Sequence, residues 1–197
     1  MNHIIVEDKL RDTNPVPVVI AFTPNYFIPA STCLYSIFAS LDTEEQMHVI
    51  CLLSEELPDR LKQKIQLIGG ERAQYSFINL QGRLQNIYID AKYTEAASYR
   101  LLLPDLLPEY DKVMYIDCDI IVRNNLVKLY RSVDLGNHYL AAVFEAPMDF
   151  QLGHLKAIGC HPDEYVNSGF LIMNLELMRR DNMVEKFIDA SKADYLE

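Results

Sequence analysis

Short apolar runs and amphipathic stretches alternate along the first half of the chain. Residues Val16–Phe22 form a continuous apolar run of β-forming residues, which predicts a strand buried on both faces. From Ala30 to Leu41 the apolar positions recur at helical spacing, and Pro29 is compatible with a first helical turn. The pattern therefore predicts a strand, a loop and a helix in that order.

The same alternation continues. Residues His48–Leu53 predict a second strand, with Ser54 as the candidate cap of a helix whose apolar stripe runs from Leu57 to Ile68. A pair of glycines beginning at Gly69 predicts the end of that helix, and Tyr75–Leu80 predicts a third strand. Strands and helices that alternate at this spacing are typical of an α/β fold with a mainly parallel central sheet and helices on both faces.

The second half of the chain begins less regularly. After an irregular stretch over residues 81–93, a helix is predicted from Thr94, its candidate cap, to Leu103, with Pro104 as its stop. Residues Lys112–Ile116 predict a further strand, and a helix-like stretch runs from Leu175 to Ala190. Ligands of such sheets bind at the carboxyl ends of the strands, so the residues after Ile116 are of particular interest.

The composition describes one globular domain. The chain has 197 residues, of which 50% are hydrophobic, and its 18 Lys and Arg against 28 Asp and Glu give a net charge of -10. We expect a polar leader over residues 1–15 and one domain over residues 16–197. The acidic balance disfavours nucleic-acid binding through bulk electrostatics, and it favours a small ligand or one that carries its own cation.

The spacing of the cysteines and the length of the apolar runs indicate where in the cell the protein is expected. The four cysteines include no C-x-x-C pair, and no stretch approaches the roughly 18 apolar residues of a membrane span. We therefore expect a cytoplasmic protein with no membrane span in this chain. Peripheral association with the inner face of the membrane stays open for a longer protein.

Two aspartates after the fourth predicted strand are the most informative residues. Asp117 and Asp119 follow Lys112–Ile116 and precede Ile120–Val122, so they lie two residues apart inside an apolar segment. In extended chain such positions face the same side, and two converging carboxylates need a compensating positive charge. Carboxylates of this kind suit Mg²⁺ or Mn²⁺, which bridge the diphosphate of a nucleotide. The alternative is that one aspartate caps a turn and the other pairs with a basic residue.

Several segments, taken in order, resemble glycosyltransferase family 8. The matching segments are Ile20–Tyr26, Ser98–Leu101, Asp111–Val122 and Tyr165–Leu175. The family includes bacterial lipopolysaccharide galactosyl- and glucosyltransferases and the glycogenins. The resemblance extends from about Val18 to Lys186 and rests on these motifs jointly.

The resemblance implies a Rossmann-like GT-A fold and a metal-dependent, retaining hexosyltransferase. Such an enzyme would move glucose or galactose from UDP-glucose or UDP-galactose to a glycan or lipopolysaccharide acceptor. Asp117 and Asp119 would hold Mn²⁺ (or Mg²⁺) on the diphosphate. Further donor contacts are implied for Ala21, Thr23, Asn25 and Arg100. Asn167 and Glu145 match positions near the donor or acceptor sugar, and they are the candidate catalytic residues.

Other functions are weighed against this one. A nucleotide-sugar-binding domain without turnover is favoured by the lack of an acidic residue that the family commonly has near Thr23. A haloacid-dehalogenase-like phosphatase also uses D-x-D at a strand end, but on its first strand and with Thr or Val where this chain has Ile121. A zinc site at His154, Cys160 and His161 would lack a suitably spaced fourth ligand.

The family's later half supplies a D-Q-D type motif and a histidine that completes the metal site. Neither follows Asn174 in this sequence. We therefore expect the domain to be truncated at its C-terminus, with donor and acceptor sites that are incomplete and an activity that depends on the longer protein.

Overall fold

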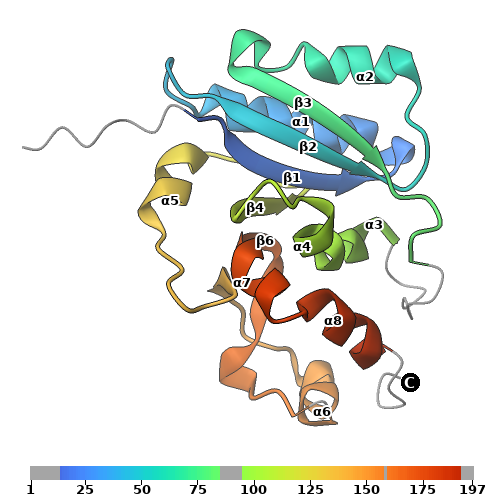
Figure 1. Cartoon of the computed structure of the whole chain (residues 1–197), viewed down its shortest axis with the longest axis vertical. Helices are drawn as coiled ribbons and strands as arrows, with labels where there is room; N and C mark the ends of the chain where they lie inside the picture. Colours follow the sequence, from blue (N-terminus) through green and yellow to red (C-terminus); the bar gives the residue numbers. More distant parts are fainter. Residues whose placement is uncertain (1–13, 85–94, 158, 192–197) are drawn as a thin grey trace, which may run out of the picture.

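The computed structural model describes residues 14–84, 95–157 and 159–191, and its centre is one six-stranded sheet (Figure 1). The strands are β1 (Val16–Phe22), β2 (Met47–Leu53), β3 (Ala73–Asn79), β4 (Lys112–Asp117), β5 (Leu140–Phe144) and β6 (Val166–Asn174). Their order is β3-β2-β1-β4-β6-β5. Strands β1 to β4 pair in parallel, whereas β6 runs antiparallel to β4 and to β5. The predicted α/β fold with a mainly parallel sheet is confirmed.

Helices cover both faces of this sheet, because successive side chains of a buried strand point to opposite faces. In β1, Val18 and Ile20 belong to one apolar core, and Val19 and Ala21 belong to the other. The first core includes residues of α1 (Phe27–Ala39), α2 (Asp59–Gln66) and α5 (Leu126–Ser132). The second includes residues of α3 (Glu95–Ser98), η3 (Tyr99–Leu102), α4 (Leu103–Leu106) and α7 (Leu175–Arg180). Figure 1 shows α3, α4 and α7 on the other side of the sheet from α1 and α2.

The remaining elements are short. They are α6 (Asp149–Ala157), α8 (Met183–Ser191), η1 (Pro24–Tyr26), η2 (Gly70–Arg72) and η4 (Pro162–Glu164). Figure 1 places α6 at the end of the molecule remote from β1, β2 and β3.

Three helix predictions are corrected by the structure. Helix α2 has Pro58 at its N-cap position, so Ser54 does not cap it. Pro104 does not stop a helix but lies in the first turn of α4, where the missing N–H costs no hydrogen bond. The stretch predicted as one helix from Leu175 to Ala190 is two helices, which are separated at Asn182 by a left-handed backbone with φ 52°.

Parts of three predictions lie outside the described residues. They are the leader up to residue 13, the irregular stretch over residues 85–93 and the proposed cap Thr94. The side chain of His154 is outside them as well.

Candidate active site

The candidate site lies at the carboxyl end of β4. Asp117 is the last residue of this strand and pairs in register with Ala21 of β1. The predicted extended chain through Asp119 is wrong, because Cys118 and Asp119 form a turn. Asp119 is therefore exposed, whereas Asp117 is half-buried. Asp117 is in the strand and Asp119 is in the turn that follows it, so the two carboxylates do not lie along one face of a strand.

Arg100 supplies the positive charge beside this pair. Its Nη2 donates to Asp117 Oδ1 at 3.2 Å, its Nε donates to the Ala97 carbonyl at 2.6 Å, and its Nη1 donates to the Ser168 carbonyl. The Arg100 side chain is only 12% exposed, so these acceptors replace most of its hydration. Arg100 thereby ties η3 to both β4 and β6.

Tyr115 lies on the same face of β4 as Asp117, since the two residues are two positions apart in the strand. Its hydroxyl donates to Asp117 Oδ1 at 3.0 Å, and the Arg100 guanidinium lies over its ring at 4.4 Å from the centroid. Burial is the main cause that raises the pKa of Tyr115 above its ordinary value, so its hydroxyl is a donor at neutral pH. Asp117 Oδ1 therefore has two donors.

The antiparallel pairing of β6 with β4, which ends with Ile116 opposite Phe170, brings Gly169 next to Asp117. The register with β5 jumps from Ala142 opposite Leu171 to Val143 opposite Asn167, so Ser168–Phe170 bulge out of the ladder with β5, while Phe170 stays paired with Ile116 of β4. A Cβ placed on Gly169 would lie 2.7 Å from Asp117 Oδ2 and 3.1 Å from Asn167 Oδ1. Only glycine fits here without movement of the aspartate. Bulges of this kind often adjust side chains next to active sites.

The two candidate catalytic residues contact each other. Asn167 Nδ2 donates to Glu145 Oε2 at 3.1 Å, and Asn167 Oδ1 accepts from the Gly169 N–H at 2.9 Å. The Asn167 amide is thus held at both ends, and it fixes the Glu145 carboxylate just after β5. Because Gly169 lies against Asp117, this pair is next to the aspartate.

The donor residues predicted in the first loop lie near the same edge of the sheet. Thr23 follows β1 directly and is half-buried, and Asn25 lies in η1 and is exposed. Neither side chain has a described contact with Asp117. They are near the site because they follow β1, whose Ala21 is paired with Asp117.

Cys118 does not join the carboxylates, although it stands between them in sequence. Its side chain lies in the core on the opposite face, and burial raises the pKa of its thiol to about 11. Cys33 of that core donates its S–H to the Asp117 carbonyl at 3.7 Å. Cys33 and Cys118 therefore pack against the end of β4 on the face of the sheet opposite the Asp117 side chain.

The donor set fits a hard divalent cation in part. Asp117 Oδ1 is engaged by Arg100 and Tyr115, whereas Oδ2 lies against Gly169 and accepts no hydrogen bond from the described residues. Asp119 adds a second, exposed carboxylate. Among the residues that the structure describes, no third His, Cys, Asp or Glu completes a cluster with them. Two carboxylate ligands with water in the other positions are a common arrangement for Mg²⁺ and related ions.

Sequence reasoning missed two residues of this site. Tyr115 and Gly169 were part of the matched segments but carried no role. Strand alternation could have identified Tyr115, because it lies two positions before Asp117. Gly169 carries no local signal, because its importance depends on a strand pairing that the sequence does not reveal.

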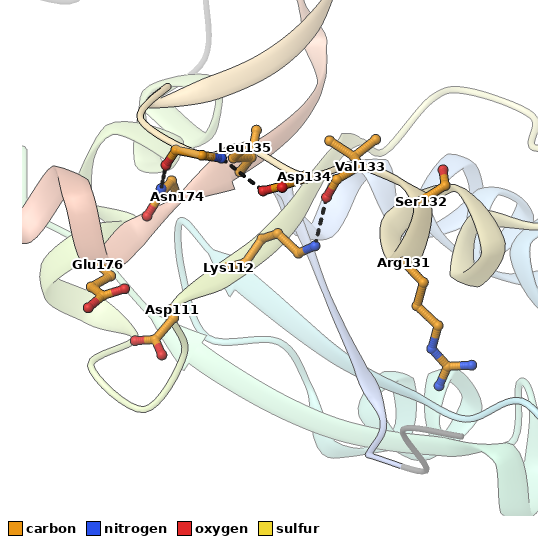
Figure 2. Close-up of a pocket in the computed structure, with 10 residues that line it drawn as sticks. Asp111, Lys112, Arg131, Ser132, Val133, Asp134, Leu135, Asn174 and Glu176 are labelled. Carbon is orange, nitrogen blue, oxygen red and sulfur yellow. Dashed lines mark hydrogen bonds between the residues drawn. The ribbon is translucent and has the colours of Figure 1, made fainter. Parts of the chain in front are cut away.

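A separate cavity of about 440 Å³ lies at the opposite end of β4, beside Lys112 (Figure 2). Lys112 Nζ donates to the carbonyls of Tyr130 and Val133 at 3.0 Å each, and it lies over the Tyr130 ring. Its charge is used to hold α5 to β4. None of the predicted site residues lines this cavity.

Comparisons with solved structures define the class. The bifunctional glycosyltransferase WbbM, in its apo form, aligns over 98% of this chain and 36% of its own with a TM-score of 0.78 and 23% identity. The galactosyltransferase LgtC, solved with donor and acceptor sugar analogues, aligns over 90% of this chain and 65% of its own with a TM-score of 0.73 and 25% identity. The fold is that of the GT-A glycosyltransferases.

The sequence then gives the family. Residues 17–195 match the family described as "Glycosyl transferase family 8", and the chain belongs to it. General stress protein A of Bacillus subtilis is 24% identical over 183 residues, which are 91% of this chain and 63% of that relative. The chain therefore spans less than two thirds of the length of this relative. Family membership excludes the phosphatase alternative, in agreement with a D-x-D pair that begins at the last residue of β4 and not on the first strand.

One further finding concerns membranes. Within the described ranges, no helix combines the length and the apolar character that a membrane span needs.

Proposed function

We propose that the chain is the donor-binding part of a metal-dependent, retaining hexosyltransferase. Its donor is UDP-glucose or UDP-galactose, and its acceptor is a glycan or a lipopolysaccharide. The observation that carries this proposal is the convergence of Asp117, Arg100, Gly169 and the Asn167–Glu145 pair at one edge of the sheet. Membership of family 8 and the likeness to LgtC, which was solved with donor and acceptor sugar analogues, support the assignment.

We assign separate roles to the charged residues at the end of β4 and to the residues at the end of β1. Asp117 and Asp119 would hold Mn²⁺ or Mg²⁺ on the donor diphosphate. When bound, such an ion neutralises negative charge on the diphosphate and so makes it a better leaving group. Arg100 pairs with Asp117 and orients its carboxylate. Ala21, Thr23 and Asn25 would line the nucleoside pocket at the end of β1.

The Asn167–Glu145 pair would contact the sugar. Asn167 is fixed by its bonds to Gly169 and Glu145, so the Glu145 carboxylate is presented in a defined orientation. That carboxylate can accept hydrogen bonds from sugar hydroxyls and can stabilise positive charge at the anomeric carbon. Groups held in advance in this way cost little reorganisation when the reaction occurs.

The experiment is a calorimetric titration of UDP into the 197-residue chain with and without Mn²⁺. We expect Mn²⁺-dependent binding that Asp117→Asn/Asp119→Asn weakens by at least about 100-fold, because two charge-bearing ligands are lost. The matched control is Asp59→Asn/Asp105→Asn, which makes the same change of net charge at two exposed helix positions. Equal UDP affinity with and without Mn²⁺ would contradict the metal-dependent donor site.

Binding without turnover is the second candidate function. The two-carboxylate donor set favours it, since a site with more water ligands holds its metal less tightly. An assay of UDP-glucose and UDP-galactose turnover, by hydrolysis or by sugar transfer, distinguishes the two functions when UDP binding is measured in parallel. Turnover supports the transferase, and UDP binding without turnover supports the second candidate. We place either function in the cytoplasm, in keeping with four cysteines that are free in the structure.

A further inference from the structure

The hydroxyl of Tyr115 is a contact of the candidate site to which neither the sequence nor the proposed function gives a role. Tyr115 is 1% exposed, so the hydroxyl lies in the interior. Its hydrogen bond to Asp117 Oδ1, at 3.0 Å, joins two side chains of the same strand face. A buried donor aimed at a half-buried carboxylate constrains the rotation of that carboxylate.

The two oxygens of Asp117 are in different surroundings. Oδ1 receives Tyr115 at 3.0 Å and Arg100 at 3.2 Å, which matches its two lone pairs. Oδ2 lies on the side of Gly169, where a Cβ would come within 2.7 Å. Among the described residues none donates a hydrogen bond to Oδ2, so Oδ2 is the oxygen left available to a ligand.

We propose that Tyr115 is a positioning residue that holds Asp117 Oδ1 and thereby directs Oδ2 to the divalent cation. This inference rests on the proposed function, because it assumes that Asp117 is a metal ligand. Arg100 could not perform this task alone. Its Nε and Nη1 are committed to the carbonyls of Ala97 and Ser168, and its single bond from Nη2 leaves the carboxylate free to turn about that bond.

The tyrosine also fixes the arginine. The Arg100 guanidinium carbon lies 4.4 Å from the Tyr115 ring centroid, close enough for a cation–π contact, and the Arg100 side chain is only 12% exposed. A Tyr115→Phe variant keeps the ring and this contact and removes only the hydroxyl. The variant therefore separates the hydrogen bond from the packing.

The test compares Mn²⁺ affinity in the presence of UDP, measured from the electron paramagnetic resonance signal of free Mn²⁺. We expect Tyr115→Phe to weaken Mn²⁺ binding roughly tenfold, the size of a lost hydrogen bond to a charged group. The matched control is Tyr75→Phe. Tyr75 lies in β3, an edge strand of the sheet, and its hydroxyl donates to the Ile68 carbonyl at 2.9 Å. Tyr75→Phe should lower the melting temperature without changing Mn²⁺ affinity.

The outcomes are distinct. Wild-type Mn²⁺ affinity in a folded Tyr115→Phe variant overturns the inference and leaves the proposed function standing. Absence of Mn²⁺ binding by the wild-type chain overturns both. A crystal structure of the wild-type chain with Mn²⁺ and UDP gives an answer that does not depend on any variant. Ligation through Oδ2, with Oδ1 on Tyr115 and Arg100, supports the inference, and ligation through Oδ1 refutes it.

Discussion

Gly169 shows how one residue without a side chain can govern a site. The position that its Cβ would occupy is 2.7 Å from Asp117 Oδ2, while Arg100 and Tyr115 hold the other oxygen of the same carboxylate. The aspartate cannot withdraw without breaking those bonds. A methyl group at this position therefore displaces the residue that the proposed function needs most.

We expect Gly169→Ala to weaken Mn²⁺-dependent UDP binding at least tenfold and to destabilise the fold by about 1–3 kcal/mol, as overpacking usually does. Calorimetric titration and thermal denaturation measure the two effects. Gly153→Ala in α6 is the control, because nothing lies within 4 Å of the added Cβ. If both alanine variants bind UDP as the wild-type chain does, the close contact between Gly169 and Asp117 is not part of the donor site.

The sequence identified Asp117, Asp119, Arg100, Asn167 and Glu145 as candidates, and the structure brings all but the exposed Asp119 into a chain of contacts. Their chemical roles stay predictions. The extended geometry predicted for the aspartate pair was wrong because the apolar residues after Asp119 suggested a continuing strand. In the structure β4 ends at Asp117, and the next two residues form a turn.

At the scale of elements, one arginine joins the segments around β4. Arg179 of α7 donates from Nη1 to the carbonyls of Pro104, Leu107 and Tyr110 at 3.3, 3.3 and 3.0 Å, and from Nη2 to Asp111 at 3.2 Å. These acceptors are the carbonyls at the end of α4 and the residues that lead into β4, groups that no helix satisfies. Arg179 thus fixes α7 and α4 at the amino end of β4.

We expect Arg179→Ala to lower the free energy of unfolding by about 2–3 kcal/mol, since several carbonyls lose a charged donor. Urea denaturation followed by circular dichroism measures this change. Arg60→Ala, at an exposed position of α2, should stay within about 0.5 kcal/mol of the wild-type value. Coincident unfolding curves for the two variants would show that the carbonyl contacts of Arg179 add nothing to stability.

The helix boundaries that the sequence missed have a common cause. Ser54 is a good cap by composition, and Pro104 a good stop, but both residues also suit other positions. The chain uses Pro104 to begin α4 and divides the last helix at Asn182, where α7 and α8 turn relative to each other. Local preferences allow these alternatives, and tertiary packing selects among them.

At the scale of the whole molecule, the candidate metal ligands lie outside the two apolar cores. The two apolar cores consist of buried aliphatic, aromatic and sulfur-containing side chains on either face of the sheet, whereas the candidate ligands lie at its edge. Metal and nucleotide should therefore add stability to a fold that already exists without them.

We expect Mn²⁺ with UDP at about 100 times its dissociation constant to add about 2.7 kcal/mol to stability. For a chain of this size that corresponds to a rise of roughly 5–10 °C in melting temperature. Differential scanning calorimetry measures the rise, and a chelator should abolish it. If the chelator also lowered the melting temperature of the ligand-free chain, the metal would have a structural role that this prediction denies.

The sequence by itself determined the alternation of strands and helices, the two-sided burial of β1, and the D-x-D pair at a strand end. These features depend on residues close together in the chain, whose periodicity follows from the backbone geometry of helices and strands. The family resemblance added the candidate site residues.

Only the tertiary structure decided how those residues meet. The order of the sheet places the antiparallel strand β6 beside β4, and the register of that pairing brings Gly169 against Asp117. Arg100 reaches Ser168 across 68 positions of sequence and Asp117 across 17. Such contacts depend on which strands pair and in what register, and a local hydrophobic pattern constrains neither when the strands lie far apart in the chain.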